Sequence, residues 1–338
     1  MMKRLLAFLL IAVLAASLAA CAGQGSTPAP AAPPAADAGG TASEPAPGGD
    51  DTVQIGLGMP DRDAWLSLME IAAVERAVEL GADMTAFEAN NDINLQMSQV
   101  ASFVTQGFDA MVIRLVAAAN GDVILDAAED VPVVFAGRLP DEAFNEPGRV
   151  HFVGVDELEA GLLQAEFAAN YFRTNHPDKT EISYILIRGR LDHPGAIYRT
   201  LGFRQGMEAA GFTLNNVVDQ PAYWDRANAM DIVQTFLGTG IPFDIIVSNN
   251  DEMALGAIEA LRAVDMMHIP VIGVDATPHG VNSIMAGELA ASIFQDAEAL
   301  GRITTEKAVA LARGEIPETH TWIPFVLVTA ENASEFPH

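Results

Sequence analysis

Short apolar, β-branched segments recur along the chain from residue 52 and alternate with segments of helical periodicity. The apolar runs span residues 53–58, 110–116, 131–135, 151–155, 182–187, 244–247, 269–274 and 291–294. In one helical segment, apolar residues at positions 93, 97, 100 and 104 fall on one face, and Gly107 is placed to end the helix. Asp63 and Asn91 are the expected N-caps of two helices.

Continuously apolar strands separated by helices are typical of parallel sheets that are covered on both faces. The strands are too numerous for one small sheet, and the sequence shows no repeat shorter than a lobe. The pattern therefore predicts an α/β protein of two doubly wound, parallel-sheet lobes. A (β/α)₈ barrel is the alternative fold.

Polar side chains follow several of the predicted strands at their carboxyl ends. They are Arg114, Asn249, Asn250, Asp251, Asp275, Gln295 and Asp296. In open α/β sheets the crevice beyond the carboxyl ends of the strands binds ligands. Each residue taken alone could instead cap a helix or fill the core, but their shared position favours a binding site.

The chemistry of these residues suits a sugar. Planar amide, carboxylate and guanidinium groups can each engage two neighbouring hydroxyls, and a charged partner strengthens each hydrogen bond. Trp65 and Trp224 lie in loop-to-helix segments, where an aromatic ring can pack against the apolar face of a sugar ring.

Signatures of catalysis are missing from the sequence. It contains no G-x-S-x-G, P-loop, H-E-x-x-H or G-x-G-x-x-G motif, and its seven histidines form no ligand pair at helical spacing. We therefore expect a protein that is not an enzyme and that holds no cofactor and no metal. A formal net charge of −27 argues against binding to nucleic acid.

The N-terminal segment has the features of an export signal. Lys3 and Arg4 precede an apolar run over residues 5–20, and the run ends in Leu-Ala-Ala-Cys at 18–21, which resembles a bacterial lipobox. Residues 22–51 are almost entirely small or polar, which predicts a disordered tether. We expect a signal peptide over 1–20, a tether over 21–51, and an extracytoplasmic protein anchored to the membrane through lipidated Cys21.

The rest of the chain resembles type I periplasmic binding proteins of ABC sugar transporters, most closely the galactose/glucose-binding family. Two stretches carry the resemblance most strongly: IVSNNDEMALGAIEAL at 246–261 and IPVIGVDA at 269–276. The resemblance implies two lobes joined by three crossovers, near residues 135–137, 294–296 and 323–325. The first lobe would contain 52–136 and 296–323, and the second 137–295 and 324–338.

The resemblance also implies a set of ligand-binding residues. Hydrogen-bonding groups are expected at Asp63, His193, Arg199, Asn250 and Asp275, and stacking rings at Trp65 and Trp224, so that the sugar lies between two rings. Three positions depart from the galactose/glucose pattern: Gly195 replaces an aspartate, Arg114 an asparagine and Gln295 another asparagine. The family's calcium loop is shortened to residues 178–183, which predicts no structural calcium.

Together these features predict a monomeric solute-binding protein that captures a monosaccharide between closing lobes and delivers it to an ABC permease. The same module could serve a chemotaxis or two-component receptor, and an extracellular carbohydrate-active enzyme is a third alternative. Arg114 and Arg199 would also suit a sugar acid or a sugar phosphate, so the identity of the sugar stays open at this point.

Overall fold

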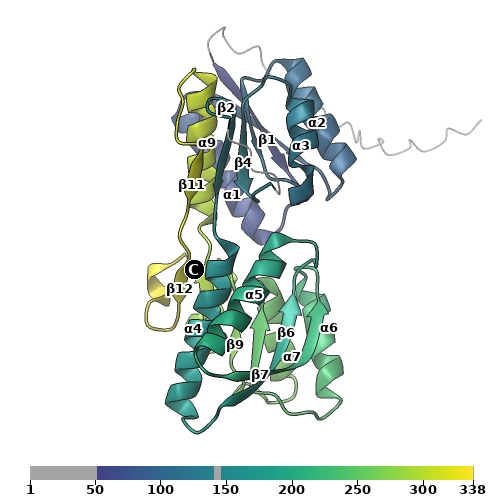
Figure 1. The fold of residues 1–338 in the computed structure, drawn as a ribbon, viewed down its shortest axis with the longest axis vertical. Helices are drawn as coiled ribbons and strands as arrows, with labels where there is room; N and C mark the ends of the chain where they lie inside the picture. The colour runs from purple at the N-terminus through teal and green to yellow at the C-terminus, as the bar shows by residue number, and fades with distance from the viewer. Residues whose placement is uncertain (1–51, 141–145, 338) are drawn as a thin grey trace, which may run out of the picture. The chain divides into compact units, whose positions relative to one another are not determined.

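The computed structural model describes residues 52–140 and 146–337. The predicted signal peptide, tether and lipidation site at Cys21 lie outside the described residues. Strands and helices alternate along the described chain, and most of the strands form two separate parallel sheets, each with helices on both faces (Figure 1). The predicted α/β class with two doubly wound lobes is confirmed, and a closed barrel is excluded.

The first lobe is built on a six-stranded sheet in which every neighbouring pair is parallel. Its strands, in spatial order, are β11 (His320–Trp322), β5 (Val150–Gly154), β4 (Val133–Gly137), β3 (Ala110–Ile113), β1 (Val53–Met59) and β2 (Ala82–Glu88). One face is covered by α1 (Ala64–Glu79) and α9 (Ala297–Ala312). The other is covered by α2 (Ile93–Gln106) and α3 (Gly121–Ala128), with a short 3₁₀ turn, η1 (Ala118–Asn120), before α3.

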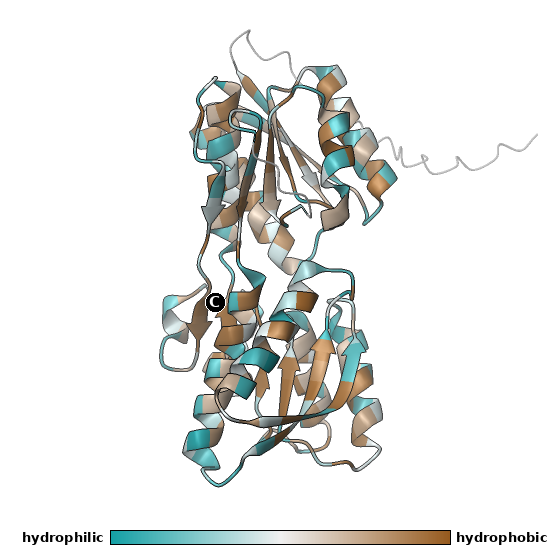
Figure 2. Cartoon of the chain, viewed as in Figure 1, coloured by the Kyte–Doolittle hydropathy of each residue, from teal (hydrophilic) through white to brown (hydrophobic). Residues whose placement is uncertain are grey.

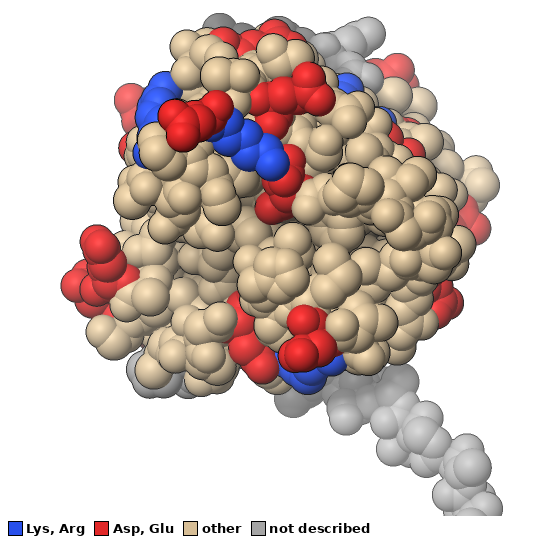
Figure 3. All heavy atoms as spheres, turned by 90° about the horizontal axis from the view of Figure 1, so that it is seen from below, with Lys and Arg blue, Asp and Glu red and all other residues tan. Residues whose placement is uncertain are grey.

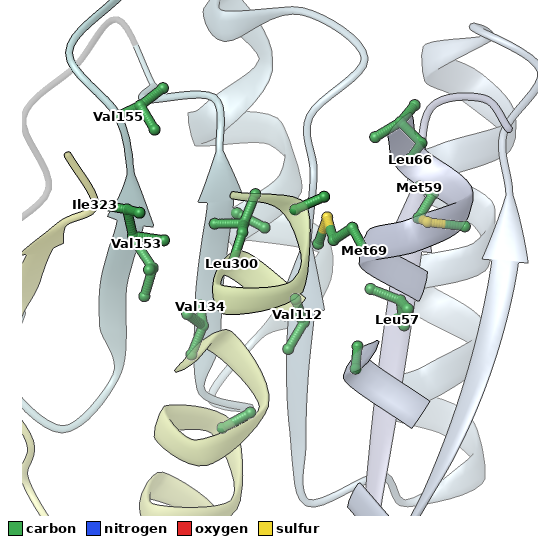
Figure 4. Packing of buried hydrophobic residues seen from close by; sticks show 14 of the residues in the cluster. Leu57, Met59, Leu66, Met69, Val112, Val134, Val153, Val155, Leu300 and Ile323 are labelled. Carbon is green, nitrogen blue, oxygen red and sulfur yellow. The ribbon is translucent and has the colours of Figure 1, made fainter. Parts of the chain in front are cut away.

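Side-chain alternation along the strands explains these two layers. Val112 of β3 packs with Met69 of α1 and Leu300 of α9 in one apolar cluster (Figure 4). Its neighbours Met111 and Ile113 point to the opposite face and belong to the cluster that contains Phe103 of α2. Both faces of this strand are therefore buried, which is why its sequence is continuously apolar rather than alternating.

The second lobe contains a four-stranded parallel sheet in the order β7 (Thr213–Pro221), β6 (Glu181–Arg188), β8 (Ile245–Ser248) and β9 (Val271–Ile272). Helices α4 (Glu157–Asn175) and α5 (Pro194–Ala209) pack on one face. Helices α6 (Arg226–Leu237), α7 (Asp251–Arg262) and α8 (Pro278–Met285) pack on the other. An antiparallel pair, β10 (Ser292–Phe294) with β12 (Val326–Val328), adjoins β9, and a 3₁₀ turn, η2 (Ala333–Glu335), follows.

The first crossover between the lobes lies later in the chain than predicted. The boundary expected at residue 136 falls at the end of β4, but the chain then returns as β5, which pairs with β4 and β11 in the first sheet. The prediction at 135–137 is therefore wrong, because the apolar run at 151–155 is a strand of the first lobe. In the described chain, three connections join the lobes, at residues 155–156, 295–296 and 323–325.

Local signals for helix ends are mostly as expected. The Asp63 carboxylate accepts a hydrogen bond of 2.7 Å from the backbone N–H of Leu66 and caps α1. Gly107 ends α2 with a φ of 76°, in the left-handed region that favours glycine. The N-cap of α2 is Asp92 rather than Asn91, because Asp92 has extended backbone while Asn91 has a φ of 57°.

Four strands lie outside the predicted apolar runs: β2, β7, β11 and β12. Both β2 and β7 lie at an outer edge of their sheet, and most of their residues are half-buried or exposed. An edge strand has one neighbour only and carries polar residues along its free side, so it lacks the continuous apolar run of an inner strand.

The hydropathy pattern follows the layers. Figure 2 shows apolar strands inside both lobes and helices whose outward faces are polar. Acidic side chains outnumber basic ones on the face in Figure 3, in keeping with the net charge of −27. No helix in the described ranges is long and apolar enough to cross a membrane.

Candidate functional site

Residues of both lobes line one cavity of about 280 Å³. Its lining consists of Pro60, Asp61, Asp63, Trp65, Leu66, Asn91, Arg114, Arg138, Arg190, His193, Arg199, Tyr223, Trp224, Asp225, Asn250, Asp275 and Gln295. All nine ligand-binding residues predicted from the sequence are in this set. The structure therefore brings them together in space, and their binding of a ligand stays a prediction.

The position of the cavity follows from the direction of the strands. Arg114 comes directly after β3, Arg138 after β4 and Gln295 after β10, while Asn250 and Asp275 lie a few residues beyond β8 and β9. Parallel strands direct all of these side chains to the same edge of each sheet.

Two arginines of the first lobe are buried at the cavity without a carboxylate partner. Arg114 and Arg138 are 6% and 8% exposed, and within the described ranges neither lies within 4.0 Å of an acidic oxygen. Arg138 donates to the carbonyl oxygens of Leu115 and Val116, and Arg114 donates to that of Ala136 at 3.3 Å. Burial lowers the pKa of both groups, that of Arg138 to about 9.

The aspartates at the cavity supply hydrogen-bond acceptors. Asp63 is exposed, and Asp275 is buried with its carboxylate 3.7 Å from Nη1 of Arg199. Burial raises the pKa of Asp275 well above its usual range, and Arg199 opposes that shift. Asp275 also has a φ of 111°, a conformation that residues with a side chain rarely adopt. Strain of this kind is common at functional sites.

Trp65 and Trp224 differ in how accessible their rings are to a ligand. Trp65 is 7% exposed, and its indole N–H donates to the backbone oxygen of Gln295 at 2.8 Å. The guanidinium of Arg114 lies 5.1 Å from its ring centroid. Trp224 is half-buried and meets His193 edge-on, with ring centroids 5.0 Å apart. Trp224 therefore has the more accessible ring.

His193 and Asn250 line the cavity and also cap the N-termini of helices. Nδ1 of His193 accepts from the N–H of Gly195 at 2.9 Å and caps α5, an arrangement that places the ring proton of a neutral histidine on Nε2. The side-chain oxygen of Asn250 accepts from the N–H of Met253 at 3.0 Å and caps α7, which leaves its amide nitrogen for other partners.

Sequence reasoning missed Arg138, Arg190, Asn91 and several further lining residues. Arg138 follows β4 directly, so the strand-end rule that found Arg114 also applies to it, but the strand is predicted to end at 135 with a crossover at 135–137. Arg190 follows β6 and pairs with Asp192 at 3.0 Å. Asn91 was interpreted as a helix cap.

Comparison with known proteins decides the family. The sequence profile of a periplasmic binding protein domain matches residues 55–316. The chain belongs to this family. A candidate rhizopine-binding protein of Rhizobium meliloti is 33% identical over 263 residues, which cover 76% of this chain and 82% of that protein. The galactose/methyl-galactoside binding periplasmic protein MglB of Haemophilus influenzae is 30% identical over 293 residues, 81% of this chain and 88% of that protein.

A solved structure extends the family assignment to three dimensions. An ABC transporter solute-binding protein of Bacillus halodurans, crystallised with myo-inositol, has a TM-score of 0.78 and 33% sequence identity. The match covers 85% of this chain and 98% of that one. The fold described here is therefore that of the periplasmic binding proteins.

Proposed function

We propose that this protein binds a small polyhydroxylated ring, a monosaccharide or a related cyclic polyol, between its two lobes and delivers it to an ABC permease. The observation that supports the ligand class most strongly is the composition of the cavity, which is lined by four arginines and four aspartates. We assign no catalytic role to the cavity.

Hydroxyl groups are suited to such a lining. An arginine only donates hydrogen bonds and an ionised aspartate only accepts them, whereas a hydroxyl does both. A ring with hydroxyls on successive carbons can therefore accept from Arg114 or Arg138 and donate to Asp63 or Asp275. The ε-nitrogens of both arginines and Nε2 of Gln295 are buried and have no hydrogen-bond partner among the described residues.

The relatives support the same class. A galactoside-binding protein and a myo-inositol-bound structure are each 30% or more identical to this chain over most of its length. A hexose and an inositol share a six-membered ring with several hydroxyls, so the proposal covers both. The solved relative is an ABC transporter solute-binding protein, which supports delivery to a permease.

Lipid anchoring completes the proposal. Cys21 would carry the lipid and the following segment would hold the binding lobes close to the membrane, which raises the local concentration of loaded protein at the permease. Loss of membrane association in a Cys21→Ser variant that is still exported would support the anchor. Unchanged membrane association would contradict it.

A thermal-shift screen tests the ligand class. The purified protein is heated with neutral hexoses, inositols, sugar acids and sugar phosphates in parallel. A ligand that binds only the native state stabilises it by about 2.7 kcal/mol at a hundredfold excess over its dissociation constant. Stabilisation by a neutral hexose or inositol would support the proposal. A response only to acids or phosphates would change the ligand class, and no response to any of them would overturn it.

A further inference from the structure

One side chain of the second lobe contacts residues in, or directly next to, all three connections between the lobes. Arg199, on α5, is 4% exposed, and its Nε donates to Oε2 of Glu157 at 2.6 Å. Glu157 is the first residue of α4, directly after the connection at 155–156. Nη2 of Arg199 donates at 2.8 Å to the side-chain oxygen of Gln295, which lies in the second connection. Its guanidinium carbon lies 6.0 Å from the ring centroid of Phe325, in the third.

The same guanidinium is also tied to the cavity. Its Nη1 donates to the backbone oxygen of Asn249 at 2.7 Å and lies 3.7 Å from the carboxylate of Asp275. Asn249 immediately precedes the lining residue Asn250. An arginine has five N–H donors in a fixed plane, and protein groups engage at least three of them here. Arg199 therefore has at most two donors left for a ligand.

We propose that Arg199 is a hinge clamp: it fixes the three inter-lobe connections against the strand ends that form the cavity and so favours the arrangement of lobes that binds ligand. Glu157 and Phe325 are then positioning residues that act through Arg199, since neither lines the cavity. The planar fork of an arginine suits this role, because it can hold several partners in one geometry. The effect of Arg199 on ligand affinity rests on the proposed function, whereas its effect on the distance between the lobes does not.

The clamp predicts that changes outside the cavity alter binding. In Glu157→Gln the ion pair with Arg199 is lost, and in Phe325→Leu the contact with the aromatic ring is lost. If the binding-competent arrangement becomes less populated, the apparent dissociation constant rises in proportion. We expect affinity for D-galactose or myo-inositol, whichever the protein binds, to fall about tenfold in Glu157→Gln, with a smaller loss in Phe325→Leu.

Distances between the lobes give a direct readout. The full chain has one cysteine, so a Cys21→Ser background allows spin labels at Ala101→Cys on α2 and Asp231→Cys on α6, both exposed. Pulsed electron paramagnetic resonance then gives the distribution of inter-lobe distances without ligand. We expect a broader or displaced distribution in Glu157→Gln and in Phe325→Leu than in the unmutated background.

A matched control is available on the same helix. Arg204 of α5 pairs with Asp219 at 2.8 Å, away from the connections and the cavity. Asp219→Asn should leave both the distance distribution and the affinity unchanged. Distributions in Glu157→Gln and Phe325→Leu that coincide with the background would overturn the clamp. If the unmutated protein responds to no hexose or inositol in the thermal-shift screen, the proposed function fails, while the ligand-free distances still test the clamp.

Discussion

The hydroxyl of Ser292 donates a 2.6 Å hydrogen bond to the carboxylate of Asp251, and both side chains are fully buried. The same hydroxyl oxygen accepts from the N–H of Ala276 at 3.0 Å, and the carboxylate also accepts from the N–H of Thr277 at 2.9 Å. These two N–H groups directly follow Asp275. The buried pair therefore holds the strained loop that presents Asp275 to the cavity.

Ser292→Ala should loosen this loop. The change leaves the N–H of Ala276 without its acceptor and removes one donor from a buried carboxylate, which together should cost about 2 kcal/mol of unfolding free energy. Ligand affinity should fall as well, because Asp275 is less well held. Urea unfolding and calorimetric titration measure the two effects. Ser102→Ala on α2, where the hydroxyl accepts from Gln106, serves as the control and should change neither.

Stability should depend on pH through Asp251. Burial raises the pKa of Asp251 to about 7, whereas an unfolded aspartate titrates near 3.9. Between these values the native state binds more protons than the unfolded state, so stability falls as pH rises from about 4 to 7. Asp251→Asn should show a shallower fall over that window in urea unfolding. The charge of Asp251 also raises the pKa of Asp275, so the difference between the two proteins reports on both carboxyls, and equal slopes would contradict the assignment.

Two substitutions of Asn250 should separate binding from capping. Asn250→Ala removes both the amide at the cavity and the cap of α7, and the lost cap should cost about 1 kcal/mol of stability. Asn250→Ser keeps a capping oxygen and removes the amide. We expect both variants to lose ligand binding and only Asn250→Ala to be clearly destabilised. Normal binding by Asn250→Ser would show that the amide does not contact the ligand.

Close packing of α4 against α5 should make Gly161 intolerant of a side chain. A Cβ atom at Gly161 would overlap the backbone oxygen of Arg199. Gly161→Ala should therefore separate the helices and destabilise the protein by about 1–3 kcal/mol in urea unfolding. Gly238 is the matched control: its φ is −63° and the nearest atom to an added Cβ is 3.4 Å away. Gly238→Ala should be neutral or slightly stabilising.

The sequence allowed most of the inner sheet and the site to be predicted, because both depend on local patterns. Runs such as 110–116 are apolar on both faces, and polar residues directly follow them, so Arg114 and Asp275 could be found from position alone. The lobe to which residues 151–155 belong depends on pairing with β4 and β11, and the latter is distant in sequence. The proposed role of Arg199 likewise depends on Glu157, Gln295 and Phe325. These residues lie far apart in the sequence, so no helical or strand periodicity links them to Arg199.

The polar edges of the two sheets affect how the protein behaves when it is crowded. Strands β2 and β7 leave one row of backbone groups free, and such a row can pair with the edge of another molecule. Exposed Asp83 on β2 and the exposed residues Asn215 and Asn216 on β7 oppose that pairing, since charged and amide side chains disfavour edge-to-edge association. These polar side chains therefore disfavour pairing of β2 or β7 with a strand of a neighbouring molecule.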